Sequence, residues 1–150
     1  MCYRREDSAD VAGRIYDKLV VEFGKEAVYR DLDAIPFGED FREHIRGCLS
    51  TCLVGLVVIG PDWCTMIGRS GGPRLHDPAD QVRLEVEAML ARGAMRTIPL
   101  FVRGAESPTP EALPAPLQPL AFKHGVNIRR DPDFITTWIV CWRSSGRSRS

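Results

Sequence analysis

Two glutamates on one predicted helix are the residues of this sequence best spaced for electrostatic or acid–base chemistry. At 100° per residue, Glu85 falls about 40° outside Met89, and Glu87 falls about 60° beyond Leu90. Each carboxylate therefore lies at a margin of the apolar face, where it can point into a cleft beside the core. The spacing is also that of two solvated helix residues, and it leaves both interpretations open. The apolar face is formed by Val82, Val86, Met89, Leu90 and Gly93.

A second constellation, His44, Cys48 and Cys52, has the i, i+4, i+8 spacing of one helical face. It suggests metal ligands, but it supplies only three, and both cysteines occupy an apolar stripe, where cysteine behaves as a small buried hydrophobe. We therefore predict no metal site. The chain has five cysteines and no CxxC pair, which argues against a disulfide scaffold and for a reducing cytoplasm.

The chain as a whole has the size and composition of one globular domain. It has 150 residues, of which 44% are hydrophobic, and 20 Lys plus Arg balance 20 Asp plus Glu. A net charge of zero gives no electrostatic reason to bind nucleic acid or an anionic membrane. The longest apolar run, residues 53–59, is far shorter than the ~20 residues of a spanning helix. We predict neither kind of partner.

Strand and helix signals alternate along the sequence. Short apolar runs predict strands at residues 1–3, 27–29, 53–59, 97–102 and 126–128. Such alternation predicts a parallel sheet with helices on both faces. Pro99 lacks an N–H donor, so we expect the fourth strand to lie at an edge or to carry a bulge.

Helical periodicity fills the segments between these strands. Asp7 or Ser8 is expected to cap the first helix, which Gly24 ends, and Asp77 with Pro78 is expected to open the third. The second helix has an apolar stripe of Phe41, Ile45, Cys48, Leu49 and Cys52. A last helix is predicted to end at residue 142, so the domain is expected to span residues 1–142, and residues 143–150 form a polar tail expected to be disordered.

Ligands of parallel α/β sheets bind beyond the carboxyl ends of the strands. The segments expected there are residues 4–8, 31–39, 60–80 and 103–107. We expect any site to be built from them.

Several of these segments resemble bacterial Toll/interleukin-1 receptor (TIR) domains. The stretches that carry the resemblance are residues 3–8 (YRREDS), 30–38 (RDLDAIPFG), 60–63 (GPDW) and 83–87 (RLEVE). The second stretch matches the family's BB loop, and the resemblance extends in one register from residue 1 to about residue 134. It implies the TIR fold, a flavodoxin-like five-stranded parallel sheet with helices on both faces.

The resemblance also implies a site. The family's catalytic glutamate, which an aliphatic residue follows, corresponds to Glu85. Near it, Tyr3 can stack on a flat base, Arg4 can contact adenine or phosphate, and Ser8 with the amides of its helix can meet phosphate. Strand-end packing, a solvated charge and a plain helix cap are the alternative interpretations of these three residues.

The remaining candidates follow the second and third strands. Asp33, Ile35, Pro36 and Phe37 lie on the loop that, in the family, gates the pocket or contacts the next protomer. Phe37 is alternatively the hydrophobic staple of the second helix. Trp63 is either a wall on the nicotinamide side or a core residue.

Two functions follow from the resemblance. The first is cleavage of the N-glycosidic bond of NAD, the substrate, without a cofactor. It releases nicotinamide and linear or cyclic ADP-ribose in a cytoplasmic defence or cell-death response, after self-assembly into a homo-oligomer. The second is a non-catalytic scaffold that recruits other TIR domains through residues 31–39. Mimicry of host TIR domains by an effector is a third class.

Two features depart from the family. Only Met1 and Cys2 precede Tyr3, so we expect a truncated first strand that positions Tyr3 and Arg4 poorly, which favours the scaffold. The segment from Ile135 to Trp142 is also more apolar than an exposed terminal helix needs.

Overall fold

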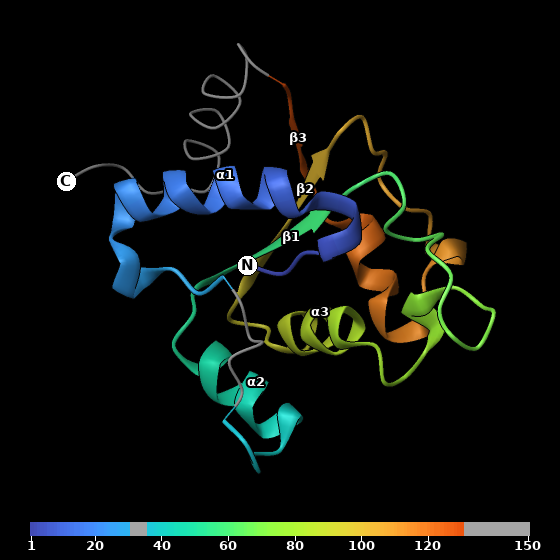
Figure 1. Cartoon of the computed structure of the whole chain (residues 1–150), viewed down its shortest axis with the longest axis horizontal. Helices are drawn as coiled ribbons and strands as arrows, with labels where there is room; N and C mark the ends of the chain where they lie inside the picture. The colour runs from blue at the N-terminus through green and yellow to red at the C-terminus, as the bar shows by residue number, and fades with distance from the viewer. Residues whose placement is uncertain (31–35, 131–150) are drawn as a thin grey trace.

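A parallel β-sheet lies at the centre of the protein (Figure 1). In the computed structural model, which describes residues 1–30 and 36–130, the sheet has three strands. They are β1 (Val54–Ile59), β2 (Arg96–Val102) and β3 (Val126–Ile128), in the order β1-β2-β3. The parallel α/β prediction is confirmed, whereas five strands are not present in the described part of the chain.

The chain start adds one bridge on the outer side of β1. The Cys2 N–H donates to the Leu56 carbonyl (2.8 Å), and the Val58 N–H donates to the Cys2 carbonyl (2.9 Å). This bridge stands where the first strand was predicted, and it leads directly into the helix α1 (Arg5–Phe23).

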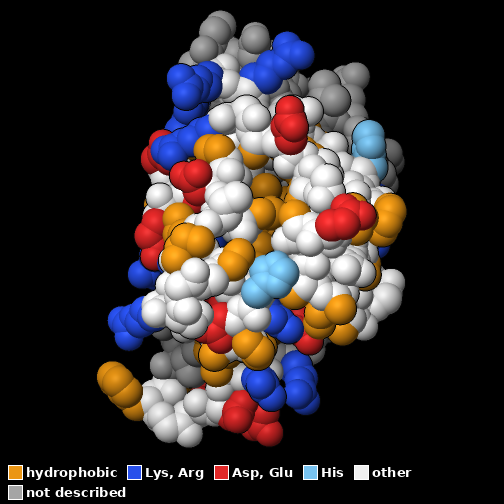
Figure 2. Space-filling view, turned by 90° about the vertical axis from the view of Figure 1, so that its right-hand side faces the viewer, with side chains coloured by type: hydrophobic (Ala, Val, Ile, Leu, Met, Phe, Trp, Pro, Cys, Tyr) orange, Lys and Arg blue, Asp and Glu red, His pale blue; other side chains and the backbone are white. Residues whose placement is uncertain are grey.

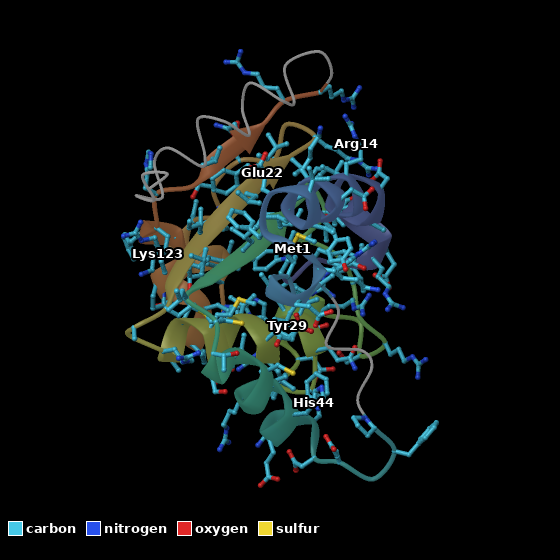
Figure 3. The ribbon with its side chains drawn as sticks, turned by 90° about the vertical axis from the view of Figure 1, so that its left-hand side faces the viewer. Met1, Arg14, Glu22, Tyr29, His44 and Lys123 are labelled. Atoms are coloured by element: carbon cyan, nitrogen blue, oxygen red, sulfur yellow. The ribbon has the colours of Figure 1, made fainter. Side chains whose placement is uncertain are left out.

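Residues 27–29 do not form the predicted strand. The 3₁₀ turn η1 (Lys25–Ala27) takes up Ala27, and the Val28 N–H closes this turn on the Lys25 carbonyl. The segment is tied to the chain start by a hydrogen bond from the Met1 amino group to the Tyr29 carbonyl (2.6 Å); both residues are labelled in Figure 3. The Val28 N–H and the Tyr29 carbonyl are used in these two bonds, and the segment runs beside Met1 without joining the sheet.

Helices cover both faces of the sheet, as predicted. Figure 1 shows α1 on one face, with α2 (Phe41–Ser50) and α3 (Gln81–Ala91) on the other, where the 3₁₀ helix η4 (Ala115–Phe122) also packs. Successive strand residues enter opposite cores, because side chains alternate along a strand. The α3 side receives Val57, Ile59 and Phe101, and the α1 side receives Val58, Leu100 and Val102.

The start of α1 differs from the prediction. The helix begins at Arg5, and Ser8 interrupts it with a non-helical backbone (φ −148°, ψ 20°). Asp7 does not cap it, because its carboxylate accepts the Asp62 N–H (3.1 Å). Ser8 stands at the kink between the first turn and the rest of the helix, and its hydroxyl donates to the Arg4 carbonyl (3.4 Å). The predicted end is confirmed, since Gly24 follows the last turn with φ 82°.

The start of α3 also differs. Asp77 and Pro78 were expected to open it, but Asp77 accepts the Ala79 N–H (2.8 Å) in a turn of its own. The cap is Asp80, whose carboxylate accepts the Arg83 N–H (3.0 Å).

The helix α2 has the predicted stripe, with Ile45 and Leu49 buried, and Asp40 caps it.

Pro99 lies in the middle strand, so the edge-strand prediction is wrong. It is paired in register with Val57 of β1, whereas pairing with β3 begins one residue later, at Leu100 and Val126. A strand residue directs its N–H to one side only. A missing donor is therefore tolerated at the point where the second ladder has not yet begun.

A buried ion pair joins the start of α1 to the start of α3. The Arg4 guanidinium, 1% exposed, donates two hydrogen bonds to the two Asp80 oxygens (3.0 and 2.9 Å). This two-point geometry suits a planar guanidinium and a carboxylate. The same Asp80 carboxylate caps α3, so the pair sets where this helix begins relative to the sheet.

We predict that Asp80→Asn lowers the free energy of unfolding by about 3–5 kcal/mol, because Arg4 then stays buried without a counter-charge. The asparagine keeps an oxygen for the Arg83 N–H. Asp77→Asn is the matched control: Asp77 is exposed and also accepts a main-chain N–H, so we expect a change within about 0.5 kcal/mol. Urea unfolding measures both variants, and equal losses would contradict the role of the buried pair.

Candidate functional site

Glu85 lies in the second turn of α3, at the margin of its buried face. Its side chain is half-buried, and its carboxylate forms a hydrogen bond with the thiol of Cys2. Cys2 is 1% exposed and is held at the sheet edge by its bridge to Val57. Glu85 is therefore directed at the residue before Tyr3, where the chain leaves the sheet, and not into open solvent.

The Cys2 thiol stays protonated beside this carboxylate. Burial raises the pKa of Cys2 well above its ordinary value, and the negative charge of Glu85 and the hydrogen bond between the two groups raise it further. The Cys2 sulfur also lies 4.0 Å from the Val82 carbonyl of the same helix. The protonated thiol is therefore a hydrogen-bond donor to the Glu85 carboxylate.

Glu87, on the other margin, has a different environment. Its side chain is 41% exposed, and its carboxylate lies 3.7 Å from Nε of Arg83, one turn earlier on α3. The structure thus separates two glutamates that the spacing alone left equivalent.

Tyr3 follows Cys2 in the sequence, but its half-buried ring packs on the α1 side of the sheet, opposite Cys2 and Glu85, and Arg30 lies against it. The Arg30 guanidinium is 5.7 Å from the centre of the Tyr3 ring and 5.3 Å from that of Tyr16. Cation–π contacts of this kind hold a guanidinium over an aromatic face. Sequence reasoning missed Arg30, because the two tyrosines lie on different elements and no local spacing connects them.

Two other candidates that closely follow Tyr3 in the sequence have buried side chains. Arg4 is neither a solvated charge nor free for adenine or phosphate in this conformation, because both of its terminal nitrogens bind Asp80. Ser8 is 1% exposed, and its hydroxyl donates to Arg4. Sequence reasoning also missed Asp80, although an acid directly before a helical pattern is a cap signal.

Trp63 belongs to the core. It is 1% exposed, within the cluster that α3 and η4 cover, so core packing is the interpretation that the structure supports.

Of the loop candidates, Asp33 and Ile35 lie outside the described residues. The predicted last helix and the polar tail lie outside them as well.

Phe37 is fully exposed, so it is not the staple of α2. Beside it, the Pro36 carbonyl accepts the Glu39 N–H (3.1 Å) in a turn. The residues at the staple positions, before the cap and four residues into the helix, are Glu39 and His44. They make a polar contact instead of an apolar one, with Glu39 Oε2 3.0 Å from His44 Nδ1. Phe37 therefore has no packing role in this part of the structure.

Loops from three of the four predicted segments meet at the carboxyl edge of the sheet. Asp7 accepts the Asp62 N–H, and Arg103 donates to the Asp7 carbonyl (2.8 Å) and pairs with the Asp10 carboxylate. Gly60 fits closely here, because a Cβ atom would come within 2.2 Å of an Asp7 oxygen. Figure 2 shows the right-hand side of Figure 1, on which positive, negative and apolar side chains are interspersed.

The described residues contain no cluster of three or more side chains that could hold a metal ion. Within that same part of the chain, no helix is both long enough and apolar enough to cross a bilayer.

Comparison with known proteins identifies the family. The model of the TIR domain family matches residues 1–136, so the chain belongs to the TIR domain family. No curated protein matches the sequence. The fold is similar to that of the TIR domains in the structure of the activated Roq1 resistosome, which directly recognises the pathogen effector XopQ. That likeness has a TM-score of 0.67 and covers 97% of this chain and 96% of the other at 11% identity, so it concerns the fold alone.

Asp7 and Asp10 provide opposite pH dependences of stability. Burial raises the pKa of Asp7 from its ordinary 3.8, so its charge costs stability as the pH rises through and above that value. The hydrogen bond from Arg103 lowers the pKa of Asp10, so its charge contributes stability that is lost as the pH falls below 3.8.

We therefore predict that Asp7→Asn raises the melting temperature near pH 7, with a gain that shrinks toward pH 4, whereas Asp10→Asn lowers it slightly near pH 7. The amide oxygen of the asparagine introduced by Asp7→Asn can still accept the Asp62 N–H. Thermal unfolding between about pH 4 and about pH 8 measures both effects. A loss of stability in Asp7→Asn at neutral pH would contradict the assignment.

Proposed function

We propose that this TIR domain cleaves the N-glycosidic bond of NAD, with Glu85 as the catalytic carboxylate, in a defence or cell-death signalling response. The observation that carries the proposal is the position of Glu85, half-buried at the sheet edge and held by the Cys2 thiol. Membership of the TIR family and the likeness to TIR domains of a resistosome support immune signalling.

One carboxylate suffices for this reaction because of the leaving group. Ordinary glycosidases need a second carboxyl group to protonate the departing oxygen. Nicotinamide leaves a cationic pyridinium as a neutral molecule, so no acid is required. Positive charge develops on the ribose, and an ionised Glu85 facing it stabilises the transition state more than the ground state. Water or a nitrogen atom of the adenine then attacks the ribose carbon that nicotinamide has left. Attack by water gives linear ADP-ribose, and attack by adenine gives cyclic ADP-ribose.

Cys2 and Tyr3 have supporting roles in this mechanism. The neutral Cys2 thiol donates to the Glu85 carboxylate and thereby orients it. The half-buried Tyr3 ring offers a flat apolar surface for a base on the α1 side of the sheet, where Arg30 lies against it.

We predict that Glu85→Gln lowers the release of nicotinamide from NAD by at least about 100-fold while weak NAD binding remains, and that Glu85→Ala abolishes turnover. Glutamine keeps an oxygen that accepts from Cys2, so the fold is expected to persist. Glu87→Gln, on the same helix but paired with Arg83, is the control and should retain the parent rate.

Chromatography of concentrated protein incubated with NAD measures these rates. Cleavage at the parent rate by folded Glu85→Gln would contradict the catalytic assignment. No cleavage by the folded parent protein at high concentration would instead favour the scaffold function.

The exposed Phe37 favours a second function, TIR–TIR contact. A fully exposed aromatic side chain contributes little to folding, but it is a good anchor in a protein interface. We propose that the loop carrying Phe37 contacts another TIR domain, in assembly of the enzyme or as a scaffold.

We predict that Phe37→Ser weakens concentration-dependent self-association, because it removes an anchor without disturbing the core. Phe122→Ser is the matched control, since Phe122 is 78% exposed on η4, away from that loop. Sedimentation velocity over a concentration series measures both. If Phe37→Ser associates as the parent does, this loop is not the contact.

A further inference from the structure

Three side chains at the start of α2 form a hydrogen-bonded relay. Glu39 Oε2 lies 3.0 Å from His44 Nδ1, and His44 Nε2 lies 3.5 Å from the Cys48 sulfur. His44, which Figure 3 labels, thus uses one ring nitrogen for a carboxylate and the other for a thiol. The sequence pattern produces this order, because His44 and Cys48 are one helical turn apart and Glu39 precedes the Asp40 cap.

The order of groups is that of a nucleophile, a base and a residue that orients the base. In such arrangements the base takes the proton of the nucleophile as it attacks, and the carboxylate stabilises the resulting imidazolium. Glu39 can do this for His44, because its negative charge lies against the nitrogen that faces away from the thiol.

Cys48 depends on this base for its reactivity. Burial raises the pKa of Cys48, and the neighbouring Cys52 and Glu39 raise it further, so the resting thiol is protonated. Cys52 does not compete for the imidazole, since its thiol donates to the Cys48 carbonyl (3.3 Å).

The relay is also accessible. Cys48 is half-buried, and the side chains of His44 and Glu39 are 19% and 52% exposed. Cys2, by contrast, is sealed in the core at 1% exposure. Cys64 provides an internal reference: it is half-buried like Cys48, burial likewise raises its pKa, and within the described residues it has no hydrogen-bonded base.

We propose that Cys48 is a nucleophilic modification site, activated by His44 and Glu39, for soft carbon electrophiles of the α,β-unsaturated carbonyl class. The Cys48 proton passes to His44 Nε2 as the sulfur electron pair forms a bond to the β-carbon. The carbon–carbon double-bond pair moves to the carbonyl as an enolate. The proton then returns to the α-carbon, so the thiol adds across the double bond with no oxidant and no leaving group.

An adduct at Cys48 has a local consequence for the loop before α2. It occupies space next to the His44 ring and removes the thiol from it, while Glu39 holds the other side of the same ring and lies two residues after Phe37. Modification of Cys48 therefore disturbs the Glu39–His44 contact, which joins this loop to α2.

The test is the rate at which each cysteine of the folded chain reacts with limiting N-ethylmaleimide, read by peptide mass spectrometry. We expect Cys48 to react at least about tenfold faster than Cys64, as general-base assistance implies. His44→Gln should reduce the Cys48 rate to about that of Cys64 while leaving Cys64 unchanged, and Glu39→Gln should give an intermediate rate.

Glu43→Gln is the matched control, because Glu43 is an exposed acid on the same helix outside the relay, and it should keep the parent rate. The Cys64 rate in each sample reports whether a variant has unfolded. A Cys48 rate equal to that of Cys64 in the parent, or one that His44→Gln leaves unchanged, would overturn the proposal. The measurement involves no NAD, so its result is independent of the proposed function.

Discussion

The buried charge of Arg4 is the constraint on which the arrangement of the site depends. A guanidinium that is 1% exposed needs a counter-charge and hydrogen bonds, and Asp80 supplies both. Arg4 follows the bridge residue Cys2 by two positions, and Asp80 precedes Glu85 by five on the helix that it caps. One ion pair therefore brings the two ends of the Cys2–Glu85 contact together, although these residues are far apart in the sequence.

A second polar network holds the loops at the carboxyl edge of the sheet. Asp7 joins the first turn of α1 to the loop after β1, and Arg103 joins the same turn to the end of β2. Arg103 has φ 55°, a conformation that non-glycine residues adopt rarely, and its two contacts with α1 stabilise it there. These bonds replace the helix cap that the sequence led us to expect at Asp7.

Glu85 and Cys48 have chemically distinct neighbours. Glu85 has a neutral thiol as its hydrogen-bond donor. Cys48 has an imidazole and a carboxylate, which suit a thiol that must lose its proton. Each environment follows from the identity of the neighbouring group, and the exposed Phe37 precedes both residues in the sequence.

The sequence by itself determined the elements with strong local patterns. The apolar run of β1, the stripe of α2 and the marginal position of Glu85 were readable because periodicity reports which face of an element is buried. The tertiary structure decided where Arg4 points, that Asp80 caps α3, that Pro99 is tolerated in a middle strand, and that Arg30 joins Tyr3 and Tyr16. These outcomes depend on partners from distant segments, whose positions no local spacing encodes.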